Sequence, residues 1–213
     1  MSGIDRTIVK ICGITRVEDA RAALDCGADW IGVILKGDSP RRIDVARARA
    51  ISAAIDGATV VAVMVGPSPE EALELARRAG ATRVQLHRVD AFRWPAGFPM
   101  PVAMAVPVGA DGSLGETLPP ERHTVLLDTS DARLAGGTGR TFPWEAARVV
   151  AATRPVLLAG GLDDGNVAEA VGAVRPLGVD ASSRLESSPG VKDPERVRRF
   201  VAAVRACEAS RES

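Results

Sequence analysis

The sequence predicts one (β/α)8 barrel spanning residues 1–213, and three observations lead to it. Short β-branched runs alternate with longer amphipathic stretches, which is typical of repeated βα units around a parallel sheet. Eight strand-like runs fit within 213 residues, a number that favours a closed TIM barrel over an open doubly wound sheet. No linker or low-complexity segment divides the chain, so we expect a single domain.

The expected strands are short and mostly apolar, because strands buried on both faces of a parallel sheet carry continuous hydrophobic runs. They span 8–12, 30–35, 60–65, 83–87, 101–106, 123–128, 155–159 and 178–182.

Helical spacing of apolar residues, with glycine or proline near the ends, predicts helices between most of these strands. They span 17–26, 45–55, 69–79, 144–152, 166–174 and 194–206. The connections after the fourth and fifth strands differ, because prolines and glycines interrupt them. We therefore expect at most one helical turn in 90–99 and mostly loop in 107–122, so that the barrel has degraded helices there.

Composition limits the possible partners. Lys+Arg and Asp+Glu balance at 27 each, so no net charge directs the chain toward nucleic acid or an anionic membrane. No apolar run approaches the roughly 18 residues of a membrane span, and no leader pattern opens the chain, so we expect a cytoplasmic protein. Three widely spaced cysteines without a CxxC pair argue against a disulfide framework and a metal site. Both a monomer and a homodimer suit this fold.

Polar residues at the carboxyl ends of the expected strands are the first candidates for a site, because these ends line the active-site face of a barrel. Cys12, His87 and Asp128 occupy such positions. Asp128 follows three apolar residues, so it is either a catalytic carboxylate or a cap on the following turn. Cys12 taken alone is more typical of a small buried hydrophobic residue.

Glycine-rich segments indicate a phosphate site. Gly160 and Gly161 follow the strand at 155–159, and Ser182 and Ser183 close the strand at 178–182. Barrels commonly bind phosphate with backbone N–H groups of these two loops. The segment 136–140, with Gly137 and Gly139, lacks the Lys-Ser/Thr of a P-loop and is expected to be a mobile loop that closes over a ligand. Arg41 is either a solvated loop residue or a fork for a substrate carboxylate.

Taken together, several motifs resemble those of phosphoribosylanthranilate isomerases of tryptophan biosynthesis. They are KICGIT, SPRR, VQLH, LLDT followed by GGTGRTFPW, LAGGL, and VDASSRLESSPGVKD, in the order and spacing of that family from Lys10 to about Phe200. The resemblance is weakest over 88–121. It implies a cofactor-free Amadori rearrangement of N-(5-phosphoribosyl)anthranilate, a small phosphorylated substrate, to 1-(2-carboxyphenylamino)-1-deoxyribulose 5-phosphate.

The resemblance also implies roles for individual residues. Asp128 would be the general acid on the ribose ring oxygen and Cys12 the general base that takes the C2′ proton. The mechanism then needs a thiolate at Cys12 and a proton on Asp128 near neutral pH. Arg41 would bind the anthranilate carboxylate, and the backbone around Gly160, Gly161, Ser182 and Ser183 would bind the phosphate. Asp180 would orient that loop. His87 would shape the end of its strand and would not transfer a proton.

Some positions depart from the family pattern and keep alternatives open. Arg88 and Arg184 stand where glycine is usual, Pro143 stands where aspartate is usual, and 32–35 lacks phenylalanine. We expect Arg184 either to contact phosphate or to be held at positive φ. These departures leave the pocket for the substrate's aromatic ring in question. One alternative is therefore a paralogous histidine-pathway isomerase that acts on another aminoribosyl phosphate. Those enzymes use an aspartate pair, so Cys12 argues against this alternative. Another is a non-catalytic phosphate-binding barrel, against which the retention of both Cys12 and Asp128 argues.

Overall fold

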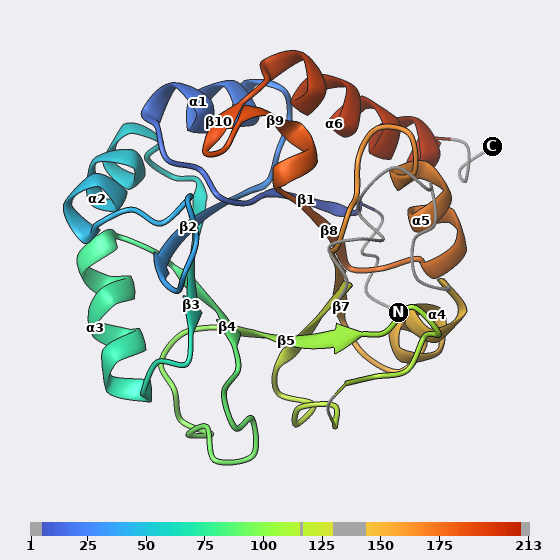
Figure 1. Ribbon diagram of the computed structural model, residues 1–213, viewed down its shortest axis with the longest axis horizontal. Coiled ribbons are helices and arrows are strands. Elements are labelled where there is room, and N and C mark those ends of the chain that lie inside the picture. Colours follow the sequence, from blue (N-terminus) through green and yellow to red (C-terminus); the bar gives the residue numbers. More distant parts are fainter. Residues whose placement is uncertain (1–5, 116, 130–143, 210–213) are drawn as a thin grey trace.

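The computed structural model describes residues 6–115, 117–129 and 144–209, which contain a closed eight-stranded parallel barrel (Figure 1). The strands follow one another around the barrel in sequence order, and β8 pairs with β1 to close it. This confirms the predicted fold class. The strands are β1 Ile8–Ile11, β2 Trp30–Lys36, β3 Thr59–Val65, β4 Arg83–His87, β5 Val102–Val108, β6 Thr124–Thr129, β7 Val156–Leu158 and β8 Gly178–Ala181.

Helices surround the barrel on its outside (Figure 1). Within the described residues no helix joins β4 to β5 or β5 to β6, as the prolines and glycines there predicted. The first of these connections instead packs Trp94, which is 4% exposed, against Phe98 with their ring centroids 5.3 Å apart. The helices are α1 Val17–Asp25, α2 Val45–Ala54, α3 Pro69–Ala79, α4 Trp144–Ala151, α5 Val167–Val174 and α6 Pro194–Ala209.

Helix α3 shows why several predicted bounds agree with the structure. The side chain of Ser68 accepts a hydrogen bond from the Glu71 amide, and Pro69 occupies the first turn, where its missing N–H costs nothing. Gly80 ends the helix in the left-handed conformation, with a φ of 73°. Each of these residues is visible in the sequence, so α3 begins and ends where it was predicted.

Side chains on the strands separate into two layers. One hydrophobic cluster, which includes Val9 and Ile11 of β1, packs between the barrel and its helices. A second, smaller cluster of Ala103, Leu126 and Leu157 fills part of the barrel interior. Successive residues of a strand alternate between the two sides, so Lys10 must face the interior. No helix within the described ranges is long and apolar enough to cross a membrane.

The connection from β8 to α6 holds structure that we did not predict. A single 3-10 turn, η1, covers Ser183–Leu185, and a small antiparallel hairpin follows, with strands β9 Glu186–Ser188 and β10 Val191–Lys192. Figure 1 places this hairpin beside α1, and the amide of Lys192 donates to Asp19 of that helix at 3.0 Å. Strands of two and three residues carry too little periodicity to be recognised in a sequence.

Candidate active site

A pocket of about 370 Å³ opens at the carboxyl ends of the strands. This is the face on which barrel enzymes place their active sites, and the volume suits a small organic ligand. Gly137 and Gly139 lie outside the described residues. All the other predicted site residues line the pocket: Cys12, Arg41, His87, Asp128, Gly160, Gly161, Asp180, Ser182 and Ser183.

Cys12 follows directly after β1 and is 7% exposed. Its amide donates to the carbonyl of Ala181 at 2.8 Å, which fixes the residue against the end of β8. Burial raises the pKa of the Cys12 thiol, while the positive charge of Lys10 acts in the opposite direction. A general base at this position therefore depends on nearby cations to form its thiolate.

Two glycines leave room for this arrangement. A Cβ on Gly32 would lie 2.9 Å from the sulfur of Cys12. A Cβ on Gly13, which has a φ of +72°, would lie 2.6 Å from Cδ of Arg41 and 2.9 Å from Oγ of Ser182. Any side chain at either glycine would displace a residue of the pocket wall.

Asp180 lies on the interior side of β8, and its bonding differs from our expectation for it. Its carboxylate accepts a hydrogen bond from Nζ of Lys10 at 2.8 Å, and the side chains of Lys10 and Asp180 are 0% and 6% exposed. Asp180 therefore lines the pocket from inside the barrel, bound to a lysine that we did not predict as a site residue. One signal was available: Lys10 precedes Cys12 by two residues in an apolar strand, so both face the same side.

Arg41 forms part of a buried charge cluster with Glu186 and Lys192. Its Nε and Nη2 atoms donate to the two carboxylate oxygens of Glu186 at 2.8 and 2.7 Å. Lys192 donates from Nζ to the same carboxylate at 2.8 Å and to the carbonyl of Ser182 at 3.1 Å. Burial acts to raise the pKa of Glu186, but the two cations outweigh it and hold that pKa below its ordinary value. The cluster joins Arg41 to the loop after β8.

The sequence analysis missed Glu186 and Lys192 because they face each other across the unpredicted hairpin, where Lys192 pairs with Glu186 in the register. The only available signal was their charge within the segment 185–193, which is ordinary for a loop.

The loop after β7 depends on two glycines. Gly160 and Gly161 have φ values of 89° and 68°, in the left-handed region that favours glycine. The side chain of Asn166 donates to the carbonyl of Gly161 and accepts from the amide of Asp163, both at 3.0 Å, which fixes the loop. Arg184 also lines the pocket, with Nη1 3.8 Å from a carboxylate oxygen of Asp163.

Two arginines stand where the family resemblance predicted glycine, and their backbones differ. Arg88 has a φ of 54°, in the left-handed region, whereas Arg184 does not have positive φ. Positive φ at Arg184, one of its two predicted alternatives, is therefore wrong, and the left-handed backbone at Arg88 was not predicted. Arg184 lines the pocket together with Gly160 and Gly161.

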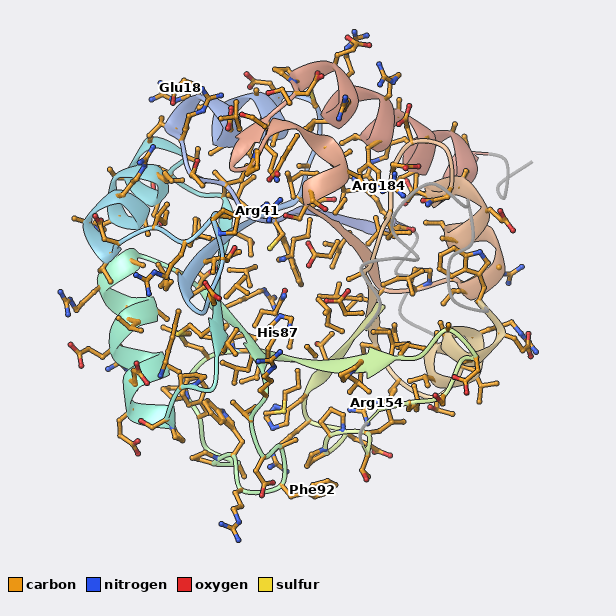
Figure 2. All side chains as sticks on the ribbon, in the orientation of Figure 1. Glu18, Arg41, His87, Phe92, Arg154 and Arg184 are labelled. Carbon is orange, nitrogen blue, oxygen red and sulfur yellow. The ribbon has the colours of Figure 1, made fainter. Side chains whose placement is uncertain are left out.

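His87 lies on the other side of the barrel from Arg41 and Arg184, as Figure 2 shows. Its Nε2 atom is 3.0 Å from Nε2 of Gln85. Burial, together with the charges of Lys10 and Arg88, lowers the pKa of His87 to about 4. The imidazole is therefore neutral near pH 7 and does not supply a proton there.

Asp128 reaches the same pocket from β6, separated from β1 by β7 and β8 in the barrel. Its carboxylate is partly buried at the end of an apolar strand. A thiol and a carboxylic acid thus approach one ligand volume from different strands, which is the arrangement that general acid–base catalysis needs. Within the described ranges, no group of three or more potential ligands could hold a metal ion.

Comparison with known proteins agrees with the sequence resemblance. A model of the N-(5'-phosphoribosyl)anthranilate (PRA) isomerase family matches residues 9–203. An N-(5'-phosphoribosyl)anthranilate isomerase from Rubrobacter xylanophilus is 43% identical over 202 residues, which cover 92% of this chain and 98% of that relative.

Solved structures of the same family superpose on this barrel. The phosphoribosylanthranilate isomerase of Thermotoga maritima matches with a TM-score of 0.81 and 31% identity, covering 94% of this chain and 99% of that one. A phosphoribosylanthranilate isomerase in complex with reduced 1-(o-carboxyphenylamino)-1-deoxyribulose 5-phosphate matches with a TM-score of 0.77 and 30% identity, at the same coverage. The chain belongs to the N-(5'-phosphoribosyl)anthranilate isomerase family.

Proposed function

We propose that this chain isomerises N-(5-phosphoribosyl)anthranilate in tryptophan biosynthesis, with Cys12 as general base and Asp128 as general acid. The observation that carries the proposal is a single pocket bordered by both residues, by Arg41 and by the loops after β7 and β8. The solved relative with reduced 1-(o-carboxyphenylamino)-1-deoxyribulose 5-phosphate supports it, because that ligand has the skeleton of the expected product.

The chemistry consists of proton transfers and needs no oxidant. Asp128 donates a proton to the ribose ring oxygen, the bond between that oxygen and C1′ breaks, and a Schiff base forms between C1′ and the anthranilate nitrogen. The thiolate of Cys12 then removes the proton from C2′, and the resulting enolamine becomes the ketone as C1′ gains a proton and the hydroxyl on C2′ loses one. The ring oxygen and C1′ each gain a proton while C2′ and its hydroxyl each lose one, so substrate and product have the same composition.

Substrate binding is assigned to the two groups of polar residues at the mouth. Arg41 uses Nε and Nη2 to hold Glu186, and since a guanidinium has five N–H donors it keeps donors for the anthranilate carboxylate. The phosphate is assigned to backbone N–H groups around Gly160, Gly161, Ser182 and Ser183, with Arg184 as an additional cation. The segment with Gly137 and Gly139 remains a proposed closing loop.

The wider predictions from the sequence also remain proposals. We propose that residues 1–213 form one domain that acts in the cytoplasm, without a cofactor, a nucleic acid or a membrane partner. Both a monomer and a homodimer remain compatible with this fold.

The test compares two substrates with the purified wild-type protein. We expect turnover of N-(5-phosphoribosyl)anthranilate and little turnover of the imidazole aminoribosyl phosphate of the histidine pathway. The reverse preference would identify a histidine-pathway isomerase instead. Complementation of a tryptophan auxotroph by wild type, but not by Cys12→Ser or Asp128→Asn, would separate the enzyme from a barrel that only binds phosphate.

A further inference from the structure

Lys10 and Cys12 border the same small space inside the barrel. A Cβ built on Gly32 of the neighbouring strand would lie 3.0 Å from Nζ of Lys10 and 2.9 Å from the sulfur of Cys12, so the two atoms are within about 6 Å of each other. Because position 32 is a glycine, no side chain separates them. The ammonium group is the cation nearest to the proposed base on its own strand.

Burial makes this lysine unusual. Its side chain is 0% exposed, and an ammonium so deep in a protein loses its proton unless a negative charge holds it. Asp180 supplies that charge at 2.8 Å. Burial acts to lower the pKa of Lys10, but Asp180 and Cys12 outweigh it and keep that pKa above its ordinary value. Lys10 is therefore charged near neutral pH.

The other charged groups near Cys12 come from the remaining elements that pack against it. Lys10 pairs with Asp180, and Arg41 and Lys192 pair with Glu186. These three cations and two carboxylates leave one excess positive charge, which a thiolate at Cys12 would cancel. His87 is neutral near pH 7 and contributes none. The titratable and charged groups around the pocket are Lys10 of β1, Asp180 of β8, Arg41 after β2, Glu186 and Lys192 of the hairpin, Arg184 of η1, His87 of β4 and Asp128 of β6.

We propose that Lys10 is a positioning residue for the isomerisation: its ammonium stabilises the thiolate of Cys12, and Asp180 fixes that ammonium in place and offsets part of its charge. This inference rests on the proposed role of Cys12 as the base. It also gives Asp180 a role inside the barrel that differs from orienting the phosphate loop.

The two partners should act on Cys12 with opposite signs. Burial raises the pKa of the thiol, Lys10 and Lys192 lower it, and Asp180 raises it. With Asp180 removed, the thiolate of Cys12 is the negative charge left to hold the Lys10 ammonium, so the variant should favour the thiolate. Removing Lys10 and Asp180 together should disfavour the thiolate, because the lysine has the larger effect. A pair that only supported the fold would not shift the thiol in two directions.

The experiment measures how fast Cys12 reacts with iodoacetamide at different pH values, since only the thiolate reacts. Peptide-resolved mass spectrometry separates Cys12 from Cys26 of the same molecule, which serves as an internal reference. The variants are Asp180→Asn, Lys10→Met, and the double variant Lys10→Met with Asp180→Asn. The double variant leaves no unpaired buried charge, so it tests the idea even if Lys10→Met alone fails to fold.

We expect the alkylation midpoint of Cys12 to rise by about one pH unit or more in the double variant, which is about a tenfold loss of thiolate below the midpoint. In Asp180→Asn the midpoint should fall. The acidic limb of the kcat/KM profile should move with it in each case. Lys36→Met is the matched control, because Lys36 of β2 forms a partly exposed ion pair with Glu71 of α3, and its removal should leave the Cys12 midpoint unchanged.

The inference would be overturned if the alkylation midpoint of Cys12 were the same in wild type, Asp180→Asn and the folded double variant. Shifts of the same sign in both variants would also overturn it. The titration needs no substrate, so its outcome is independent of whether wild type turns over N-(5-phosphoribosyl)anthranilate, and failure of the proposed function would be recognised separately.

Discussion

The two sides of the barrel mouth differ in their use of charge. The charged wall consists of Lys10, Arg41, Asp180, Glu186 and Lys192, on β1, β8, the loop after β2 and the hairpin, and its ion pairs are mostly buried. The neutral wall consists of Val63, Gln85 and His87 on β3 and β4, with Asp128 of β6 at its rim. Figure 2 shows Arg41 and Arg184 on one side and His87 on the other.

This difference suits a substrate with anionic groups at both ends. Cations on one wall can hold a carboxylate and a phosphate and also favour a thiolate at Cys12. Asp128, which we propose as the proton donor, comes from the opposite wall, where the histidine is neutral near pH 7. Separation of the two walls would let one pocket hold the proposed ionised base and the proposed protonated acid together.

The largest effect should come from removing one catalytic residue on each side. Cys12→Ser and Asp128→Asn should each lower kcat/KM by about 10²- to 10⁴-fold, since each removes one positioned proton-transfer group. Steady-state rates with N-(5-phosphoribosyl)anthranilate measure this. A loss smaller than about tenfold in either variant would mean that the residue is not the acid or the base.

Loss of a carboxylate should lower the free energy of unfolding more in the charged wall than at the protein surface. Glu186→Gln should lower the free energy of unfolding by about 2–4 kcal/mol, because it leaves the buried Lys192 and the mostly buried Arg41 without a counter-charge. It should also raise KM more than it lowers kcat, since Arg41 loses its support. Urea unfolding and steady-state kinetics test both effects.

The matched control is Glu71→Gln, which breaks the partly exposed pair with Lys36 and should cost less than about 1 kcal/mol. Equal losses in the two variants would contradict the special status of the charged wall.

The free energy of unfolding should depend on pH through His87, which lies in the neutral wall. The folded protein keeps this imidazole neutral down to about pH 4, whereas the unfolded chain binds a proton near its ordinary value. The unfolded state therefore binds more protons between about pH 6.5 and 4, and stability should fall as the pH is lowered through that window. We expect wild type to lose about 2–3 kcal/mol more than His87→Asn over that range in urea unfolding. Parallel curves for the two proteins would contradict a neutral His87.

The smallest effect concerns the backbone next to His87. Arg88 has a φ of 54°, which costs a residue with a side chain about 1–2 kcal/mol relative to glycine. Glycine loses more backbone entropy on folding than arginine does, and this offsets part of the gain. Arg88→Gly should therefore stabilise the protein by about 0.5–1 kcal/mol. Arg88→Ala keeps the Cβ atom and should give no such gain. Thermal unfolding of both variants compares them, and a destabilised Arg88→Gly would show that the arginine side chain has a structural role.

Much of the fold was accessible from the sequence because its signals are local. Pro69 and Gly80 predicted the bounds of α3, and the apolar runs predicted all eight strands to within two residues. The pocket also followed from a general rule, since carboxyl ends of parallel strands converge in a barrel. The residues expected at those ends therefore lie together wherever the structure describes them.

What could not be predicted depends on contacts between distant residues. Lys10 and Asp180 are separated by 170 positions, and nothing near either residue indicates its partner. Glu186 and Lys192 meet across strands too short to show a pattern. Arg41 was expected at a substrate carboxylate, and its bidentate bond to Glu186 was not foreseen.

The assignment of base and acid is tested most directly by substrate deuterated at C2′. In Cys12→Ser, removal of the C2′ proton becomes the slow step, so the isotope effect on kcat/KM should be larger than in wild type. In Asp128→Asn, ring opening becomes slow and precedes that step, so the isotope effect should shrink toward unity. The opposite order in the two variants, or no isotope effect in Cys12→Ser, would contradict the roles assigned to these residues.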